Sequence, residues 1–389
     1  MTKALAKRIC QYTLFISAIA LLLFAVWLVG ALWTRSQIQR INAGISEIYR
    51  ADGVADQGYV TIGGVRQWIT ARAMSKGQPL LLYLHGGPGS AVSDFSYAFQ
   101  KPWEDYFTVV QWDQRGFGRS AIDLDKMGPV TKDQLVADAI ELIEVLRKRY
   151  RQDKVILVGH SFGTIIGASV ARARPDLLHA YVGLGQVTNW PTLFQDSKDA
   201  MLAIARASGD KDFVARLTRI PPGPPAANVE AFGEWSGTIQ AEAAPKGYFW
   251  YNARSGEDLA RRTLSWPLLS PSVSLREFAS TLFRDDSRKT RLPLVRSVAT
   301  WDFRKDLGRR FDVPMIFVSG RHDLTTPVGK TAELEREIDA PYKAMNILQH
   351  SAHVMFLEEP ARLLKILTDE VLPLATAPVP APARQGTSQ

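Results

Sequence analysis

The chain has 389 residues, of which 46% are hydrophobic and 22% are charged, and this composition excludes a largely disordered protein. The formal net charge is +8, but the basic residues are spread along the chain, with short clusters such as Arg147–Arg149. The charge therefore indicates a solvated surface, which can face anionic lipid headgroups, and no nucleic-acid partner is expected. The sole cysteine, Cys10, excludes an intrachain disulfide.

A basic segment at 1–9 is followed by an apolar stretch at 10–33 that predicts a single membrane-spanning helix. No residue from Gln11 to Trp33 is charged. A helix rises about 1.5 Å per residue, so this stretch is long enough to cross a hydrocarbon core about 30 Å thick. A signal peptide cleaved near Gly30 and Ala31 is the alternative, although its apolar region is usually shorter.

Basic residues flank the apolar stretch on both sides. Lys3, Lys7 and Arg8 precede it, while Arg35 and Arg40 follow it. Because the amino-terminal cluster is denser, the positive-inside tendency places residues 1–9 in the cytoplasm and the folded part outside.

A stem at 34–53 leads into the first half of the folded core, at 54–185. An antiparallel hairpin is predicted at 59–70, where two strand-like stretches meet at Gly63-Gly64. The next predicted strand, Leu80–Leu84, runs directly into His85-Gly86-Gly87-Pro88-Gly89. Consecutive glycines leave backbone N–H groups uncovered, and such a group can bind the negative oxygen of an acyl-transfer intermediate. We assign this donor to Gly87.

The pattern continues with strands at 107–112 and 155–158 and a helix at 132–149. Directly after the second of these strands comes Gly159-His160-Ser161-Phe162-Gly163, which has the form of a nucleophile elbow. Ser161 is the candidate nucleophile, and the N–H of Phe162 is the second candidate donor to an oxyanion. His160 is expected to have a packing or supporting role. The alternation of strands and helices predicts an α/β fold with a mostly parallel, twisted sheet and helices on both faces.

The alternation stops at 186–308, a segment that contains Pro221–Pro225 and many aromatic residues. It is too long for a loop in a compact domain, so we expect an inserted helical cap. Most of its aromatic side chains are expected in the interior of the cap, and a minority would line an apolar pocket over Ser161. The candidates for substrate binding are Glu234, Trp235 and Trp250.

The second half of the core, at 309–373, supplies an acid and a histidine. Asp323 follows an apolar strand at 314–318, and His353 follows a strand at 344–348. The order serine, acid, histidine is that of the α/β hydrolases. In this arrangement His353 would take the proton of Ser161, and Asp323 would orient the imidazole. His350 is the rival base, and the Pro- and Ala-rich end at 374–389 is expected to be disordered.

Four motifs together resemble the proline iminopeptidase branch of the α/β-hydrolase superfamily: His85-Gly86-Gly87-Pro88-Gly89, Trp112-Asp113-Gln114-Arg115-Gly116-Phe117-Gly118-Arg119-Ser120, Gly159-His160-Ser161-Phe162-Gly163 and Gly320-Arg321-His322-Asp323. The resemblance implies an α/β-hydrolase fold with a helical cap after the sixth strand, a triad of Ser161, Asp323 and His353, and hydrolysis without a cofactor or metal. It also implies cap glutamates that hold the free amino terminus of a peptide. The acidic candidates for this role are Glu230, Glu234, Glu242, Glu257 and Asp258.

The leading hypothesis is a membrane-anchored serine hydrolase that acts as an aminopeptidase of the proline iminopeptidase type on a small or short-peptide substrate. An esterase or lactonase with the same triad is the close alternative. A catalytically silent binding protein on the same fold is the third, and it is disfavoured because no triad position is missing.

Overall fold

The computed structural model describes residues 3–122, 124–252, 256–283 and 289–376. Its centre is an eight-stranded sheet with the strand order β1-β2-β4-β3-β5-β6-β7-β8. The strands are β1 (Val54–Ile62), β2 (Val65–Ala73), β3 (Leu80–Leu84), β4 (Thr108–Trp112), β5 (Val155–His160), β6 (Leu178–Leu184), β7 (Met315–Gly320) and β8 (Lys343–Leu348). β1 and β2 form the antiparallel hairpin, and β2 is also antiparallel to β4, whereas β3 to β8 pair in parallel. The mostly parallel α/β sheet predicted from the sequence is confirmed.

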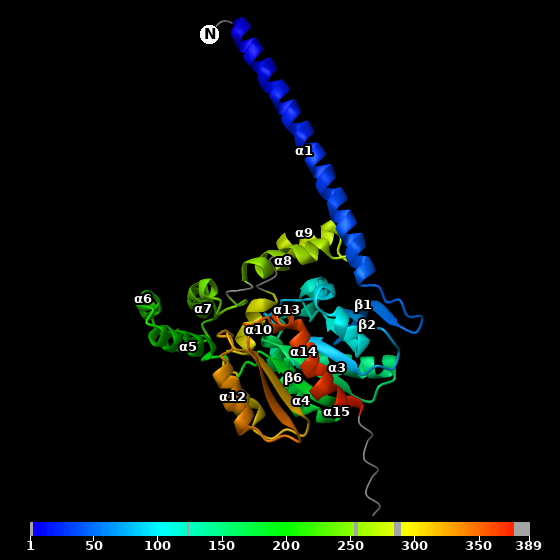
Figure 1. Ribbon diagram of the computed structural model, residues 1–389, viewed down its shortest axis with the longest axis vertical. Coiled ribbons are helices and arrows are strands. Elements are labelled where there is room, and N and C mark those ends of the chain that lie inside the picture. Colours follow the sequence, from blue (N-terminus) through cyan, green and yellow to red (C-terminus); the bar gives the residue numbers. More distant parts are fainter. Residues whose placement is uncertain (1–2, 123, 253–255, 284–288, 377–389) are drawn as a thin grey trace, which may run out of the picture.

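Helices cover both faces of this sheet (Figure 1). Those that follow the hairpin in the chain are α2 (Leu124–Met127), α3 (Lys132–Tyr150) and α4 (Phe162–Ala173). The last ones are α12 (Val328–Glu337), α13 (Met355–Glu358), α14 (Pro360–Ile366) and α15 (Leu372–Thr376). The predicted disordered end therefore begins inside a helix, and residues 377–389 lie outside the described part of the chain.

The apolar strands read as continuous hydrophobic runs because they are buried on both faces. Along β3, Leu80, Leu82 and Leu84 join the hydrophobic cluster that contains residues of α3 and α4. Leu81 and Tyr83 point the other way and join the cluster that contains residues of α13 and α14. The sheet is therefore packed on both faces, and the loops at the carboxyl ends of its parallel strands carry the candidate site.

Between β6 and β7 the described chain is helical, as the predicted insertion requires. Its helices are α5 (Leu193–Ser208), α6 (Lys211–Arg219), α7 (Val229–Ala243), α8 (Gly256–Leu269), α9 (Leu275–Phe283), α10 (Arg291–Ser297) and α11 (Phe303–Leu307). In Figure 1 the helices α5 to α9 lie to one side of the sheet, and α8 and α9 lie beside the base of the N-terminal helix.

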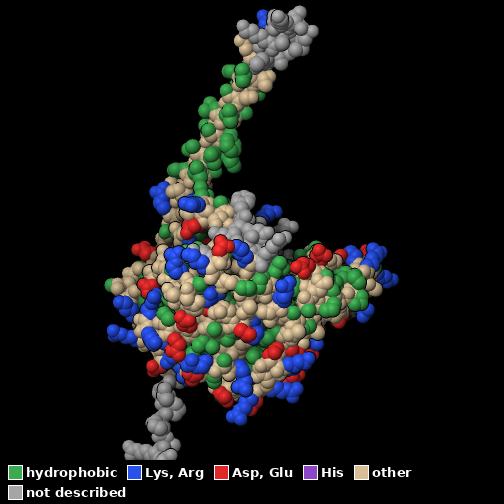
Figure 2. Space-filling model, turned by 180° about the vertical axis from the view of Figure 1, so that it is seen from behind, with side chains coloured by type: hydrophobic (Ala, Val, Ile, Leu, Met, Phe, Trp, Pro, Cys, Tyr) green, Lys and Arg blue, Asp and Glu red, His purple; other side chains and the backbone are tan. Residues whose placement is uncertain are grey.

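The N-terminal helix α1 (Lys3–Ile45) projects from the body of the molecule (Figure 1). It does not break at Trp33, so the first part of the predicted stem continues the same helix. Its apolar side chains are exposed, with Leu21 at 69% and Trp27 at 66%, and Figure 2 shows them along the shaft. The helix is long and apolar enough to cross a membrane, and a signal sequence shares both properties.

Candidate active site

Ser161 lies on a sharp turn between β5 and α4. Its φ is 51° and its ψ is −121°, a conformation that side-chain-bearing residues rarely adopt and that often marks a functional site. The turn is fixed by a hydrogen bond from the Ser161 N–H to the Leu184 carbonyl at the end of β6, 2.9 Å long. The strand and the helix hold the hydroxyl-bearing residue where β5 ends.

The glycines of the elbow are required by close backbone contacts. A Cβ at Gly159 would lie 2.7 Å from the Gly163 carbonyl oxygen. A Cβ at Gly163 would collide with the Leu84 carbonyl oxygen of β3 and would lie 2.8 Å from that of His85. The two glycines thus let α4 start directly against the neighbouring strand.

The glycine-rich loop after β3 lies against this elbow. A Cβ at Gly86 would be 2.9 Å from both the Cβ of Ser161 and the carbonyl oxygen of His160. Within the described residues, the backbone N–H groups of Gly87 and Phe162 have no backbone acceptor. Phe162 is also the first residue of α4, where the helix dipole favours negative charge.

Hydrogen bonds between Gln114 and His85 fix the start of the glycine-rich loop. The Gln114 backbone N–H donates to His85 Nε2 at 3.2 Å, and the Gln114 side chain donates to the His85 carbonyl at 3.0 Å. His85 Nδ1 lies 3.0 Å from the Gly86 carbonyl, which only accepts, so this nitrogen carries the proton. Burial lowers the pKa of His85 to about 4, which keeps the ring neutral in this arrangement.

The longer motif around Gln114 has a structural role in the described molecule. Arg115 forms a buried two-pronged ion pair with Asp138 of α3, with N–O distances of 2.6 and 2.8 Å. Asp113 accepts the Arg119 backbone N–H at 2.8 Å, and burial together with the charge of Asp94 raises the pKa of Asp113 to about 7. The side chains of Asp113 and Arg115 therefore fix the loop that carries Gln114, the hydrogen-bond partner of His85.

Asp323 and His353 meet at the carboxyl ends of β7 and β8. His353 Nδ1 lies 2.9 Å from Asp323 Oδ2, and both side chains are buried. Asp323 Oδ2 also accepts the Thr326 hydroxyl at 2.7 Å, and Oδ1 accepts the backbone N–H groups of Thr325 and Thr326 at 2.9 Å. The carboxylate is therefore held by four hydrogen bonds, one of which fixes the imidazole ring.

This pairing determines the tautomer of His353. A carboxylate only accepts, so Nδ1 carries the proton, and Nε2 of the neutral ring is a hydrogen-bond acceptor. His353 Nε2 is buried and has no hydrogen-bond partner among the described residues. His353 Nε2, the ring nitrogen that does not face Asp323, is thus a proton acceptor without a hydrogen-bond partner in the described residues.

Ser161 follows His160, whose ring lies 4.9 Å from the ring of His353, so the elbow and the histidine loop are neighbours. Gly185 follows Leu184, which accepts the Ser161 N–H, and a Cβ built at Gly185 would lie only 3.2 Å from both Asp323 Oδ2 and His353 Cε1, so this turn packs tightly against the pair. The Ser161 hydroxyl does not donate to His353 Nε2 in the structure, a bond that is often long in sites without substrate. The structure thus joins Asp323 to His353 directly and joins the elbow to the His353 loop through His160.

His160 joins the elbow to the histidine loop, a contact that the sequence did not indicate. Its ring lies 4.9 Å from the ring of His353, and its Nε2 donates to the His353 carbonyl at 3.0 Å. Burial, with the nearby His353, lowers the pKa of His160 to about 3. The neutral His160 ring therefore supports the backbone of His353. This agrees with the supporting role expected for His160 and identifies His353 as its partner.

His350 lies elsewhere. Its side chain is exposed, its backbone carbonyl accepts the Asn252 side chain at 3.0 Å, and its backbone N–H donates to Glu359 at 2.8 Å. Asp323 contacts the ring of His353 and forms no described contact with His350.

The three substrate-binding candidates lie in different places. The ring of Trp250 packs 5.6 Å from that of His353, and Trp250 is 37% exposed, so it borders the site. Trp235 is buried in the cap, where its Nε1 donates to the Pro221 carbonyl at 3.0 Å and its ring packs on Phe232. Glu234 is exposed on α7. Of these residues, the structure brings only Trp250 to His353.

The other acidic candidates are also accounted for, apart from Glu257, whose side chain lies outside the described part. Glu230 is exposed, Glu242 pairs with Arg216 at 2.8 Å, and Asp258 lies 3.8 Å from Arg262. In the described residues no group of three or more His, Cys, Asp or Glu side chains is arranged to hold a metal ion.

Comparison with known proteins supports the fold described above. Residues 79–219 match the model of the alpha/beta hydrolase fold family. A probable aminopeptidase, YbaC, of Bacillus subtilis is 28% identical over 325 residues, which cover 79% of this chain and 94% of that protein. A proline iminopeptidase of Xylella fastidiosa is 25% identical over 284 residues, covering 68% and 87%.

Among solved structures, a proline iminopeptidase-related protein from Thermus thermophilus superposes with a TM-score of 0.56 at 19% identity, covering 82% of this chain and 98% of that one. This likeness shows the shared fold. Taken with the elbow, the glycine-rich loop and the sheet order, the matches show that the chain has an α/β-hydrolase fold and is similar in sequence to a probable aminopeptidase and to proline iminopeptidases.

Proposed function

We propose that the chain is a membrane-anchored serine hydrolase in which Ser161 is the nucleophile, His353 the general base and Asp323 the group that orients the base. The observation that carries the proposal is the buried His353 ring, which donates from Nδ1 to Asp323 and keeps Nε2 free beside the elbow. A weak alcohol nucleophile needs an adjacent base in this arrangement.

The reaction proceeds through an acyl-enzyme. As Ser161 Oγ attacks the substrate carbonyl, its proton passes to His353 Nε2, and the negative oxygen of the intermediate accepts the N–H groups of Gly87 and Phe162. The imidazolium then returns the proton to the leaving group, and the acyl–leaving-group bond breaks. Water, deprotonated by His353, hydrolyses the ester on Ser161 and restores the free enzyme. No step uses a cofactor.

The leading substrate class is a short peptide with a free amino terminus, as in a proline iminopeptidase-like aminopeptidase. The support is sequence similarity over most of the length of a probable aminopeptidase and of a proline iminopeptidase. Trp250, at the edge of the site beside His353, offers an apolar surface for a proline ring or a similar side chain.

Ester or lactone hydrolysis is the second candidate, and the positions of the cap carboxylates favour it. A peptide amino terminus is protonated near neutral pH and needs an anionic partner when it is bound. Among the described contacts, Glu230 and Glu234 form none with His353 or Trp250, and Glu242 is paired with Arg216 at 2.8 Å. An ester substrate has no such requirement.

The membrane anchor is α1, with residues 1–9 in the cytoplasm and the hydrolase outside. The support is the exposed apolar shaft, which is costly in water, and the denser basic cluster before it. Protease treatment of intact spheroplasts tests the topology, because a catalytic part that stays protected until lysis would reverse it.

A substrate panel divides the candidates. A prolyl amide, an alanyl amide and nitrophenyl esters of short and long chain are compared for kcat/KM, each with the wild-type chain and with Ser161→Ala. An aminopeptidase turns over the prolyl amide best, whereas an esterase turns over only the esters. Activity that persists unchanged in Ser161→Ala contradicts both assignments, and absence of any turnover together with absence of covalent labelling supports a silent binding protein.

A further inference from the structure

The helix α1 is bound to the cap along its last turns. Arg35 donates from Nε to the Leu268 carbonyl at 3.0 Å and from Nη2 to the Val273 carbonyl at 2.7 Å. One turn later, the Gln39 side chain donates to the carbonyls of Ser270 at 2.5 Å and Val273 at 3.1 Å. These acceptors are carbonyls at the end of α8 and in the segment that follows it, where a helix lacks intrahelical donors, and the Ser270 carbonyl also accepts the Val273 N–H at 3.4 Å.

A second set of contacts continues this attachment toward the core. Asn42 donates to the Leu269 carbonyl at 3.0 Å, and Tyr97 donates to the Trp266 carbonyl at 3.1 Å. Phe95 stacks on Trp266 with 6.2 Å between ring centroids. The end of α8 is therefore held between α1 and the segment after the glycine-rich loop.

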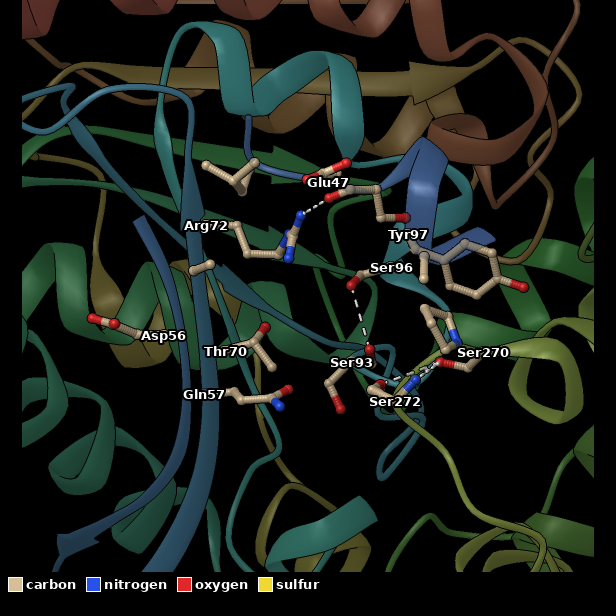
Figure 3. Close-up of a pocket in the computed structure, with 15 residues that line it drawn as sticks. Glu47, Asp56, Gln57, Thr70, Arg72, Ser93, Ser96, Tyr97, Ser270 and Ser272 are labelled. Carbon is tan, nitrogen blue, oxygen red and sulfur yellow. Dashed lines mark hydrogen bonds between the residues drawn. The ribbon is translucent and has the colours of Figure 1, made fainter. Parts of the chain in front are cut away.

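The end of α1 is also fixed to the sheet. Arg72 of β2 donates to the Ser46 carbonyl and pairs with the buried Glu104 at 2.7 Å. Lys101 donates to the Glu47 carbonyl at 2.6 Å. Figure 3 shows this junction, where the last turn of α1, β2 and the 270–272 segment surround a cavity of about 340 Å³. Because α1 is held at both ends of the stretch 35–47, its direction relative to the body is set.

This attachment places the cap at the level of the bilayer surface. Arg35 lies two residues beyond Trp33, the end of the uncharged stretch, which is an axial rise of about 3 Å. The polar headgroup layer on each side of the hydrocarbon core is about 5–7 Å thick. Side chains that reach from Arg35 to Val273 therefore bring the segment 270–276 to the depth of the headgroups.

The exposed side chains of this segment suit such a position. Pro271, Leu275 and Arg276 are exposed, with Leu275 at 43%, which combines apolar groups with a cation. Apolar and basic side chains together favour a surface of anionic lipid. Glu277, the neighbouring carboxylate, is exposed, but it lies 3.5 Å from Arg119 and accepts the Ser274 backbone N–H at 2.8 Å, so local partners offset its charge.

We propose that Pro271–Arg276 is a lipid-docking surface, so that the cap side of the hydrolase rests on the membrane from which α1 emerges. The proposal rests on the membrane anchor of the preceding subsection and adds an orientation to it. It links the bilayer to the site, because α8 starts four residues after Asn252, and Tyr251, next to Trp250, is bonded to Thr263 of α8 at 2.5 Å.

Depth-dependent fluorescence quenching tests the proposal. The full chain carries Cys10→Ser and a single labelled cysteine from Leu275→Cys, and it is reconstituted in vesicles of phosphatidylcholine and phosphatidylserine with a nitroxide on the headgroup. The matched control is Asp312→Cys, which is exposed just ahead of β7, at the opposite end of the strands. We expect strong quenching at position 275 and none at 312.

A label at 275 that is quenched no more than one at 312, in a chain that resists carbonate extraction, overturns the docking surface. A chain that carbonate removes overturns the anchor and the surface together. Labelling of Ser161 by a fluorophosphonate in the same vesicles reports the catalytic proposal separately, since it does not depend on orientation.

Quenching of the label at position 275 also tests the hydrogen bonds between α1 and the end of α8. Arg35→Ala combined with Gln39→Ala removes the bonds to α8, and we expect the quenching at 275 to fall. Arg40→Ala, an exposed position on the same helix, is the control and leaves it unchanged. Equal quenching in the double variant and the control contradicts the attachment.

Discussion

At the scale of single residues, the candidate site depends on two histidines, His353 and His160, that have different roles. His353 has a buried acceptor nitrogen without a hydrogen-bond partner among the described residues, and His160 holds the backbone of His353. The motifs predicted Ser161, Asp323 and His353 as partners because each follows a strand. The contact of His160 with a residue 193 positions away was not predictable, since nothing in the local sequence encodes it.

The choice between the two late histidines is a testable consequence. We expect His353→Ala to lower kcat by roughly a thousandfold or more, because Ser161 loses its base. His350→Ala should leave kcat close to that of the wild type, since its ring is exposed and lies away from Asp323. Steady-state kinetics on one soluble ester checks both, and equal losses would contradict the assignment.

The role of Asp323 has its own signature. Asp323→Asn keeps the size of the side chain but presents an amide N–H donor to His353 Nδ1, which favours the wrong tautomer. A loss of about 10⁴-fold in kcat is the size of effect that such a change causes in a serine protease triad. The KM should change little. A variant with normal kcat would show that the carboxylate only supports the fold.

The buried neutral His160 predicts a pH dependence of stability. Its folded pKa of about 3 lies below the unfolded value of about 6.5. The unfolded state therefore binds more protons between these values, and the contribution is fully present above pH 6.5 and is lost as the pH falls toward 3. Relative to wild type, His160→Gln should lose less stability on acidification from pH 7 to 5. Parallel thermal-unfolding curves at the two pH values would contradict this prediction.

At the scale of elements, the strands were predictable because burial on both faces makes them short apolar runs. β3, β4 and β7 match their predicted ranges within two residues, and the glycine motifs mark the turns that follow two of the strands. The helices of the cap were expected only as an insertion. Their contacts depend on side chains such as Trp235, which the sequence allows equally in the cap interior or in a substrate pocket.

The close packing of the elbow is tested by comparing Gly163 with Gly237, a glycine of α7 that has room for a side chain. Gly163→Ala forces a methyl group against the carbonyls of Leu84 and His85, so we expect a loss of about 1–3 kcal/mol and reduced activity. Gly237→Ala, in helix α7 with no atom within 4 Å of the added Cβ, should gain up to about 1 kcal/mol. Urea denaturation measures both. The same effect at the two sites would refute the close packing of α4 on β3.

At the scale of the whole molecule, α1 is the proposed membrane anchor and also a support for the cap. The sequence separated an anchor at 10–33 from a stem at 34–53, but the helix is continuous to Ile45 and the stem residues bind the end of α8. These contacts join residues more than 220 positions apart, so neither the apolar run nor the stem sequence indicated them.

Two truncations separate the functions of α1. Removal of residues 1–33 leaves Arg35, Gln39 and Asn42 in place, so we expect a soluble chain with kcat on a soluble ester close to that of the full chain. Removal of residues 1–45 deletes all three, and we expect a lower unfolding temperature and faster proteolysis within α8 and α9. Identical proteolysis of the two truncated chains would show that the stem does not support the cap.

The proposed mechanism depends most on the Ser161 hydroxyl as the reacting group. Mass spectrometry of the full chain after treatment with a fluorophosphonate locates the adduct directly. We predict one adduct, on the peptide that contains Ser161, formed by the wild type and lost in His353→Ala. An adduct on another residue, with Ser161 unmodified in an active enzyme, would contradict the proposed mechanism.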